Sequence, residues 1–264
     1  MTITFARIGA IAMAVLCLAA APALAVEIQW FEQSALKIST PGGKVILVDP
    51  FISNNPKTPE EYKDLSKIGE VDLILLTHGH GDHVGDTVEL AGMTGAKVAM
   101  NSDMGQTFRL LGLLSKEQLI RFNKGGPIQP VEGITVTMVG ADHSSEVIHD
   151  GAVHPGGEPI GFIIELEDGK TIYHAGDTGV FADMAFIGSF YDPDVAFLPI
   201  GGHFTMDPTH AAYAIENLLG PRTIVPVHYG TFPLLKGTPE ELIEALGETE
   251  AEVVVMEPGE TRTF

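Results

Sequence analysis

The chain has 264 residues, of which 45% are hydrophobic, and this is ample for one large buried core. Its 15 basic and 35 acidic residues give a formal net charge of −20. A surface this acidic repels phosphate backbones and anionic membranes, so the composition argues against nucleic acid as a partner.

The first 25 residues predict a secretory signal peptide. Arg7 precedes an apolar run at residues 8–23, and Ala-Leu-Ala at 23–25 has the small-x-small pattern of a cleavage site. The run is too short for a comfortable transmembrane helix, although an uncleaved anchor is the alternative. We therefore expect a periplasmic or secreted mature chain that starts near Val26 and does not contact the membrane. The only cysteine, Cys17, lies within this predicted signal peptide, so the mature chain has no thiolate ligand. Any metal must therefore be held by nitrogen and oxygen atoms.

The first half of the mature chain alternates short apolar runs with turn residues. We expect strands at 26–31, 35–39, 44–48 and 73–76, a helix at 84–93, a strand at 97–100, a helix at 104–114 and a strand at 131–140. Residues 160–166 and 171–175 flank the sequence Glu-Asp-Gly-Lys, which is typical of a β-hairpin.

The order of elements differs in the second half, where the expected strands at 195–200, 223–227 and 253–256 alternate with helices. The helix at 207–219 begins with the capping sequence Asp-Pro-Thr, and another helix is expected at 239–246. Each half thus starts with meandering strands and ends with strands alternating with helices. Two sheets packed face to face with helices outside satisfy this pattern, in a single domain at 26–264.

Residues 78–83 read His-Gly-His-Gly-Asp-His and directly follow the expected strand at 73–76. Imidazole and carboxylate groups bind zinc, iron and manganese. On extended backbone His78 and His80 point to the same side, whereas Asp82 and His83 diverge and can serve a second ion. The glycines between them let the backbone turn tightly. A solvated polar loop is the alternative, but the density of ligand side chains favours a metal site.

Four more polar residues follow expected strands in the same way: His143, Asp177, His203 and His228. Loops at one rim of a layered sheet converge, and ligands collect there. A lone histidine after a strand is weak evidence for a ligand. Together with the cluster at 78–83, these residues predict one composite site.

With these residues in this order, the chain resembles the metallo-β-lactamase superfamily. The matching stretches are 77–86, 175–179, 200–206 and 226–232, together with Asp49 in Val-Asp-Pro. More narrowly, the chain is similar to predicted metal-dependent hydrolases related to ascorbate-phosphate lactonase. The resemblance implies an α/β fold, a four-layer αββα sandwich, with a two-metal centre.

The resemblance also implies a role for each ligand. The first metal would be held by His78, His80 and His143, the second by Asp82, His83 and His228, with Asp177 bridging them. Zinc is the most frequent metal in the superfamily, and manganese or iron occurs in some members. Such a pair ionises a water that attacks a carbonyl or phosphorus. We expect Asp82 also to orient this water and to pass a proton.

The remaining candidates are expected to have supporting roles. His203 either faces the pocket and donates to substrate or leaving group, as a catalytic residue, or it holds its loop. We expect His174 to be a histidine of the core or one that supports a ligand, Asp49 to orient a ligand histidine, and His210 to be structural. The glycine-rich loop at 144–159 could fold over the metals and line the pocket.

The sequence therefore predicts a secreted metal-dependent hydrolase that acts on a small-molecule ester, lactone or phosphate-bearing substrate. A β-lactam hydrolase, or a phosphodiesterase or nuclease of the same fold, is the first alternative, and the acidic surface weighs against the nuclease. A non-hydrolytic metal-binding or di-iron redox protein is the second, but it needs a flavodoxin-like partner domain. No particular oligomeric state is predicted.

Overall fold

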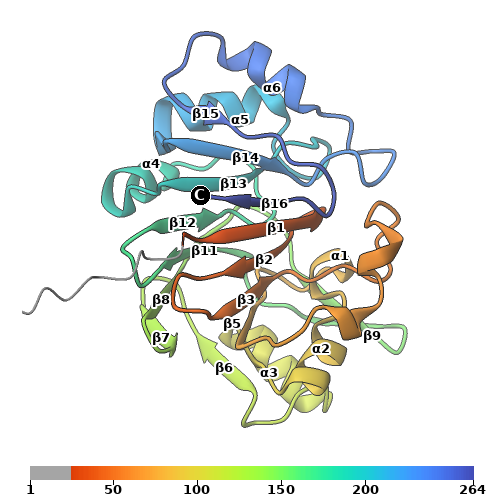
Figure 1. Ribbon diagram of the computed structural model, residues 1–264. Helices are drawn as coiled ribbons and strands as arrows, with labels where there is room; N and C mark the ends of the chain where they lie inside the picture. The colour runs from red at the N-terminus through yellow and green to blue at the C-terminus, as the bar shows by residue number, and fades with distance from the viewer. Residues whose placement is uncertain (1–24) are drawn as a thin grey trace, which may run out of the picture.

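The computed structural model describes residues 25–264, so the predicted signal peptide lies outside the described residues apart from Ala25. Two seven-stranded sheets pack face to face, and helices cover their outer faces (Figure 1). This arrangement confirms the predicted four-layer αββα sandwich. No helix in the described part is long and apolar enough to cross a bilayer.

The first sheet has the strand order β16-β1-β2-β3-β4-β5-β6. Its strands are β1 (Glu27–Glu32), β2 (Ala35–Ser39), β3 (Val45–Val48), β4 (Leu73–Leu75), β5 (Lys97–Asn101), β6 (Leu119–Phe122) and β16 (Thr261–Thr263). The pairs from β3 to β6 are parallel. The carboxyl ends of these strands therefore meet at one edge of the sheet.

The second sheet has the order β15-β14-β13-β12-β11-β8-β7, and its strands from β12 to β15 are parallel. Its strands are β7 (Ile128–Val131), β8 (Ile134–Gly140), β11 (Ile160–Glu165), β12 (Thr171–His174), β13 (Val195–Pro199), β14 (Thr223–Val227) and β15 (Glu252–Val253). A separate hairpin consists of β9 (Glu146–His149) and β10 (Ala152–Pro155).

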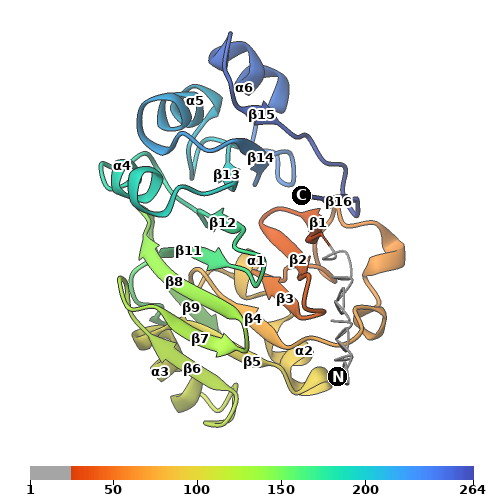
Figure 2. The same cartoon turned by 60° about the vertical axis from the view of Figure 1, so that its left-hand side comes forward.

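Helices form the outer layers, as Figure 2 shows from the side. Those over the first sheet are α1 (Gly81–Val84), α2 (Thr87–Thr94) and α3 (Ser102–Leu110), with 3₁₀ turns at Glu60–Tyr62 and Leu65–Lys67. Those over the second sheet are α4 (Met184–Phe186), α5 (Pro208–Ala214) and α6 (Pro239–Leu246), with π-helical turns at Ile187–Tyr191 and Ile215–Leu219. α5 begins at the predicted cap, where Asp207 accepts from the His210 N–H.

Three apolar layers hold the sandwich together. Trp30, Phe162 and Phe197 lie in the layer between the sheets and are almost fully buried. On β13 the neighbours Ala196 and Leu198 face the outer helices instead, so this strand is buried on both sides. Burial on both faces explains why β13 reads as a continuous apolar run rather than an alternation.

The expected helix at 84–93 is wrong in one respect, because it is broken at Gly85. Gly85 has φ +40°, and a Cβ there would lie 2.5 Å from the Pro50 carbonyl oxygen. The Asp86 carboxylate then accepts from the backbone N–H groups of residues 52 and 53, each at 2.8 Å. The break therefore docks the polar cluster onto the loop that follows β3.

Two expected strands also differ from the structure. The expected strand at 253–256 ends at Val253, and the chain instead closes the first sheet with β16, where Arg262 pairs with Ile28. β16 has no apolar alternation, since all three of its residues are exposed. The expected strand at 131–140 is a hairpin of β7 and β8.

The predicted loop at 144–159 contains the hairpin of β9 and β10, which the sequence analysis missed. Its buried Val147 packs in the helix-side core, and β9 passes directly over the loop after β4. A Cβ on Gly79 would lie 2.5 Å from the Glu146 carbonyl oxygen, whereas a Cβ on Gly81 meets nothing within 4 Å. Of the two glycines in the cluster, only Gly79 is required by a close approach.

We expect Gly79→Ala to destabilise the protein by about 1–3 kcal/mol, because β9 or the loop must shift to admit the methyl group. Gly81→Ala is the matched control and should cost much less. Denaturant unfolding of both variants checks this. Equal free energies of unfolding would contradict the close approach.

The turn between β1 and β2 carries a buried carboxyl group. Glu32 has φ +103° and is 4% exposed, and it accepts a hydrogen bond from the Thr231 hydroxyl at 3.2 Å. Burial raises the pKa of Glu32 from 4.5 to about 7. Folded protein therefore retains this proton at pH values where the unfolded chain has lost it.

We expect the wild type to lose stability relative to Glu32→Gln as the pH rises from about 4.5 to about 7, because only the unfolded state ionises in that window. The difference should reach on the order of 1–3 kcal/mol and stay constant at higher pH. Urea unfolding across this range measures it, with the exposed Glu216→Gln as control. A difference that does not vary with pH would contradict the raised pKa.

Candidate metal centre

Loops at one rim of the sandwich bring all seven predicted ligands together. His78 and His80 follow β4, Asp82 and His83 lie in α1, His143 follows β8, Asp177 follows β12 and His228 follows β14. Their ligand atoms form three groups within 4.8 Å: His78 with His80 and His143, His78 with His83 and Asp177, and Asp82 with His83 and His228. The parallel strand ends of both sheets thus contribute to one site.

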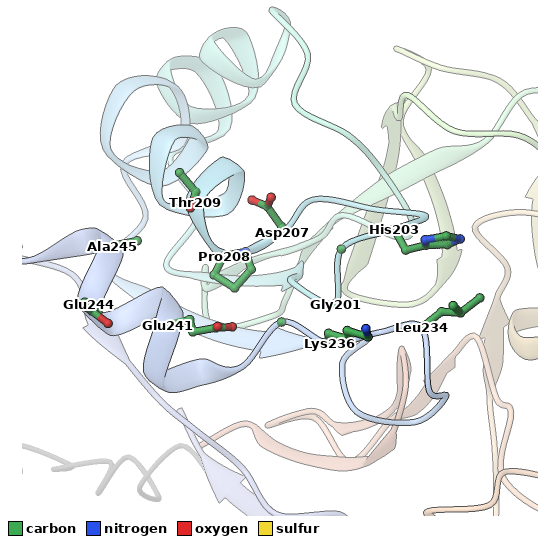
Figure 3. Close-up of a pocket in the computed structure, with 12 residues that line it drawn as sticks. Gly201, His203, Asp207, Pro208, Thr209, Leu234, Lys236, Glu241, Glu244 and Ala245 are labelled. Atoms are coloured by element: carbon green, nitrogen blue, oxygen red, sulfur yellow. The ribbon is translucent and has the colours of Figure 1, made fainter.

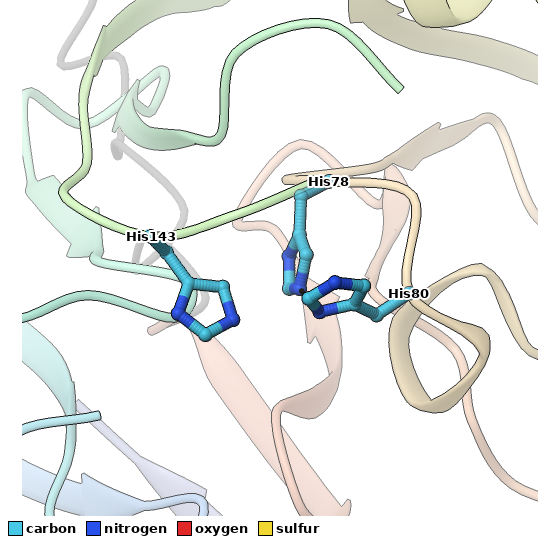
Figure 4. Close-up of side chains that lie close together, drawn as sticks. All are labelled: His78, His80 and His143. Atoms are coloured by element: carbon cyan, nitrogen blue, oxygen red, sulfur yellow. Dashed lines mark hydrogen bonds between the residues drawn. The ribbon is translucent and has the colours of Figure 1, made fainter. Parts of the chain in front are cut away.

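The first group consists of three histidines whose rings converge (Figure 4). His78 Nε2 lies 2.9 Å from His80 Nδ1. The His143 ring stands almost perpendicular to both, with centroids 5.2 and 5.1 Å away. Edge-on rings around a common point are the arrangement that three nitrogen ligands of one ion require.

Outer hydrogen bonds decide which nitrogens face inward. The Thr77 hydroxyl donates its proton to Asp49 Oδ2 at 2.6 Å, so it accepts from His78 Nδ1 at 3.0 Å. His80 Nε2 lies 3.1 Å from the Glu146 carboxylate and donates to it. The inner nitrogens then present lone pairs to each other at 2.9 Å. A shared cation relieves this repulsion, so these residues fit a metal.

The second group is arranged around Asp177. Its Oδ1 lies 3.2 Å from His83 Nε2, and its Oδ2 lies 3.0 Å from His228 Nε2 and 3.6 Å from His143 Nε2. In the described part of the chain, His83 Nε2 and Asp177 Oδ1 are buried, and apart from their contact with each other neither has a hydrogen-bond partner. Orphaned buried atoms are unfavourable, and a metal ion would satisfy both.

The electrostatics of the cluster also favour a cation. Burial, with the neighbouring His83, lowers the pKa of His78 well below its usual range, so its imidazole is neutral. Burial acts in the same direction on His228, but Asp177 and Asp82 outweigh it and raise the pKa of His228 to about 9. The same negative field attracts a divalent ion, whose binding displaces imidazole protons.

A cavity of about 470 Å³ opens over these residues. Its polar lining includes His80, Asp82, His143, Asp177 and His228. Its apolar wall consists of Phe204, Phe232 and Leu235. Ser144 and Glu146 also line it, which confirms that the segment at 144–159 reaches the pocket through its first residues.

His203 lies beside this cavity. Its exposed side chain lines a second cavity of about 710 Å³, together with Asp207 and Lys236 (Figure 3). Its ring packs edge-on against Phe204 at 4.4 Å, and Phe204 lines the metal cavity. The structure therefore places His203 at the boundary between the two cavities.

Asp49 contacts a predicted ligand directly, whereas His174 and His210 contact none. Asp49 is fully buried and accepts from His83 Nδ1 at 2.8 Å. His174 is also fully buried, and its Nε2 donates to the Ser34 carbonyl at 3.0 Å. His210 is exposed and contacts its own helix cap.

The sequence analysis missed three residues that contact the ligands. Thr77 had a weak signal, since it directly precedes the cluster. Glu146 had none, because its contact with His80 depends on the unpredicted hairpin. Gln33 lies in a tight turn far from the cluster in sequence, but its amide contacts both Asp82 and His228.

Comparison with known proteins agrees with this geometry. The family model of the beta-lactamase superfamily domain matches residues 44–229. A UPF0173 metal-dependent hydrolase of Polaromonas sp. is 52% identical over 244 residues, which cover 90% of this chain and 89% of that protein. A relative of the same name from Cupriavidus necator is 48% identical over 247 residues, with 90% and 86% covered.

A solved structure is similar over nearly the same length. Igni18, a metallo hydrolase from the hyperthermophilic archaeon Ignicoccus hospitalis, is 40% identical and superimposes with a TM-score of 0.79, covering 91% of this chain and 99% of that one. The family-model match at residues 44–229 includes every strand end that carries a predicted ligand. The chain belongs to the beta-lactamase superfamily and is a metal-dependent hydrolase.

Proposed function

We propose that the protein hydrolyses a small ester, lactone or phosphate-bearing molecule at a dinuclear metal centre. The observation that supports this best is the Asp177 carboxylate, which lies next to proposed ligands of both ions: His83 and His228 of the second at 3.2 and 3.0 Å, and His143 of the first at 3.6 Å. One carboxylate shared in this way suits a pair of ions better than a single ion.

The donor set supports the choice of metal. His78, His80 and His143 would hold the first ion, Asp82, His83 and His228 the second, and Asp177 would bridge them. Nitrogen and oxygen donors suit zinc, with manganese or iron as alternatives. When bound, such ions lower the pKa of water and stabilise negative charge that develops on the substrate.

Two side chains of the protein, those of Asp82 and His203, would orient the attacking water and the substrate. The Asp82 side chain is 27% exposed and lines the cavity, so it can contact both water and substrate. Burial opposes its ionisation, but His83 and His228 lower the pKa of Asp82 below its usual value. Asp82 therefore stays ionised as a hydrogen-bond acceptor that would orient the attacking water; passing on the proton of that water is the second part of its proposed role. His203 would donate to a substrate that extends toward the second cavity.

Cavity size and charge support the substrate class and the location. A volume of about 470 Å³ with one apolar wall accommodates a small molecule. The net charge of −20 weighs against nucleic acid. The signal-like pattern at 1–25 supports export to the periplasm or beyond.

We expect purified protein of residues 26–264 to contain two equivalents of zinc, manganese or iron, measured by elemental analysis. It should hydrolyse members of a panel of lactones, carboxylic esters and phosphate esters, and chelation should abolish turnover until metal is restored. Preference for β-lactams or phosphodiesters would favour those activities instead. Metal-free protein that does not respond to zinc or manganese would refute the proposal.

We expect His228→Ala to lose about one metal equivalent, because His228 is a proposed ligand of the second ion only. The matched control is His210→Ala, which removes an exposed imidazole outside the centre and should bind metal like the wild type. Full metal content in His228→Ala would contradict the assignment of that ligand.

We expect Asp82→Asn to lower turnover by roughly 10²–10⁴-fold and also to weaken the second ion, since the amide is a poorer ligand and cannot accept the proton. Steady-state kinetics and metal analysis measure the two effects. The exposed Asp103→Asn is the control. Wild-type turnover with both ions present would disprove this role of Asp82.

A further inference from the structure

Gln33 lies at the tight turn between β1 and β2, and its side chain lines the metal cavity. It is fully buried at φ +53°. Its carbonyl oxygen accepts from the His228 backbone N–H at 3.0 Å and from Trp30 Nε1 at 3.0 Å. These two hydrogen bonds fix the backbone of Gln33, and this backbone conformation directs the side chain toward the metal cavity.

The amide of Gln33 reaches the second ligand group. Its Nε2 lies 2.8 Å from Asp82 Oδ2 and 2.8 Å from His228 Nε2, and these two ligand atoms are 3.6 Å apart. A carboxylate can only accept, so the nitrogen of the amide must face Asp82. Gln33 thus contacts the two ligands that close the second metal position toward the cavity.

Asp82 is held by fewer hydrogen bonds than Asp49. Among the described residues, Gln33 supplies the one side-chain hydrogen bond that Asp82 receives. Asp49, by comparison, accepts from the Thr77 backbone, the Thr77 hydroxyl and His83. The Gln33 amide therefore restrains rotation of the Asp82 carboxylate, which within residues 25–264 otherwise has only the longer contacts of Oδ2 with His228 at 3.6 Å and His83 at 3.8 Å.

The same turn docks the loop that carries His228 onto the first sheet. The Thr231 hydroxyl donates to Glu32, and the Tyr229 ring stacks on Trp30 with centroids 5.6 Å apart. His228 itself has φ +54°, a conformation that the surrounding contacts must maintain. The turn thus links a ligand from the second sheet to ligands from the first.

A purely structural amide would satisfy its own polar atoms within the turn. In the described structure, Gln33 Oε1 is instead buried without a partner, while Nε2 contacts a ligand 49 positions away. This is unfavourable for folding and useful for the site. We propose that Gln33 is a positioning residue, whose amide orients Asp82 and whose turn holds His228 at the second metal position.

The inference rests on the proposed dinuclear function and is tested with Gln33→Met, which keeps the length of the side chain and removes the N–H group. We expect the affinity for the second zinc ion to fall about 10–100-fold, with the first ion changed by less than about twofold. Competition of protein 26–264 with a chromogenic zinc chelator measures both affinities. In steady-state kinetics kcat should fall by a larger factor than KM changes, because Asp82 is misoriented while the rest of the cavity lining is kept.

The exposed Gln129→Met on β7 is the matched control and should bind both ions like the wild type. Gln33→Asn is the second variant, because asparagine tolerates positive φ and is too short to reach Asp82. It should fold normally and show the same selective loss of the second ion. Wild-type affinity for both ions in Gln33→Met and Gln33→Asn, or an equal loss at both positions, would overturn the inference. A wild-type protein that binds no second ion would instead refute the dinuclear function.

Discussion

The buried carboxylate of Asp49 is the contact on which the geometry of the metal centre depends. It lies directly after β3 at φ +45° and accepts hydrogen bonds from His83 and Thr77. Through the Thr77 hydroxyl it also decides which nitrogen of His78 faces inward. One side chain therefore orients ligands from both predicted metal positions. Its removal from water is tolerated because every donor around it is aligned.

The sandwich places such contacts where they are needed. Parallel strands in both sheets end at the same rim, so β3, β4, β12 and β14 deliver polar residues to one place. The apolar layer between the sheets holds these ends in fixed register. A rigid core beneath irregular loops is what precise ligand placement requires.

Supporting contacts come from segments that are remote in sequence. The β9 hairpin crosses Gly79 and brings Glu146 to His80. The turn after β1 brings Gln33 to Asp82 and His228. These groups are not among the predicted ligands, but their hydrogen bonds restrain the direction of the ligand side chains. The cavity above them has one wall of aromatic and aliphatic residues, Phe204, Phe232 and Leu235.

The sequence by itself determined the sandwich and the composite site, because its signals are local. Apolar runs mark buried strands, and the density of imidazoles at 78–83 marks a metal site wherever the loop lies. The break at Gly85, the strand β16 and the hairpin of β9 and β10 were decided only by the tertiary structure. Each depends on a partner far along the chain. Gly85 packs against the loop that follows β3, β16 pairs with β1, and the hairpin of β9 and β10 packs on the backbone of Gly79. Contacts of Gln33 and Glu146 could not be predicted for the same reason, since a hydrogen bond between distant segments leaves no periodic pattern in either one.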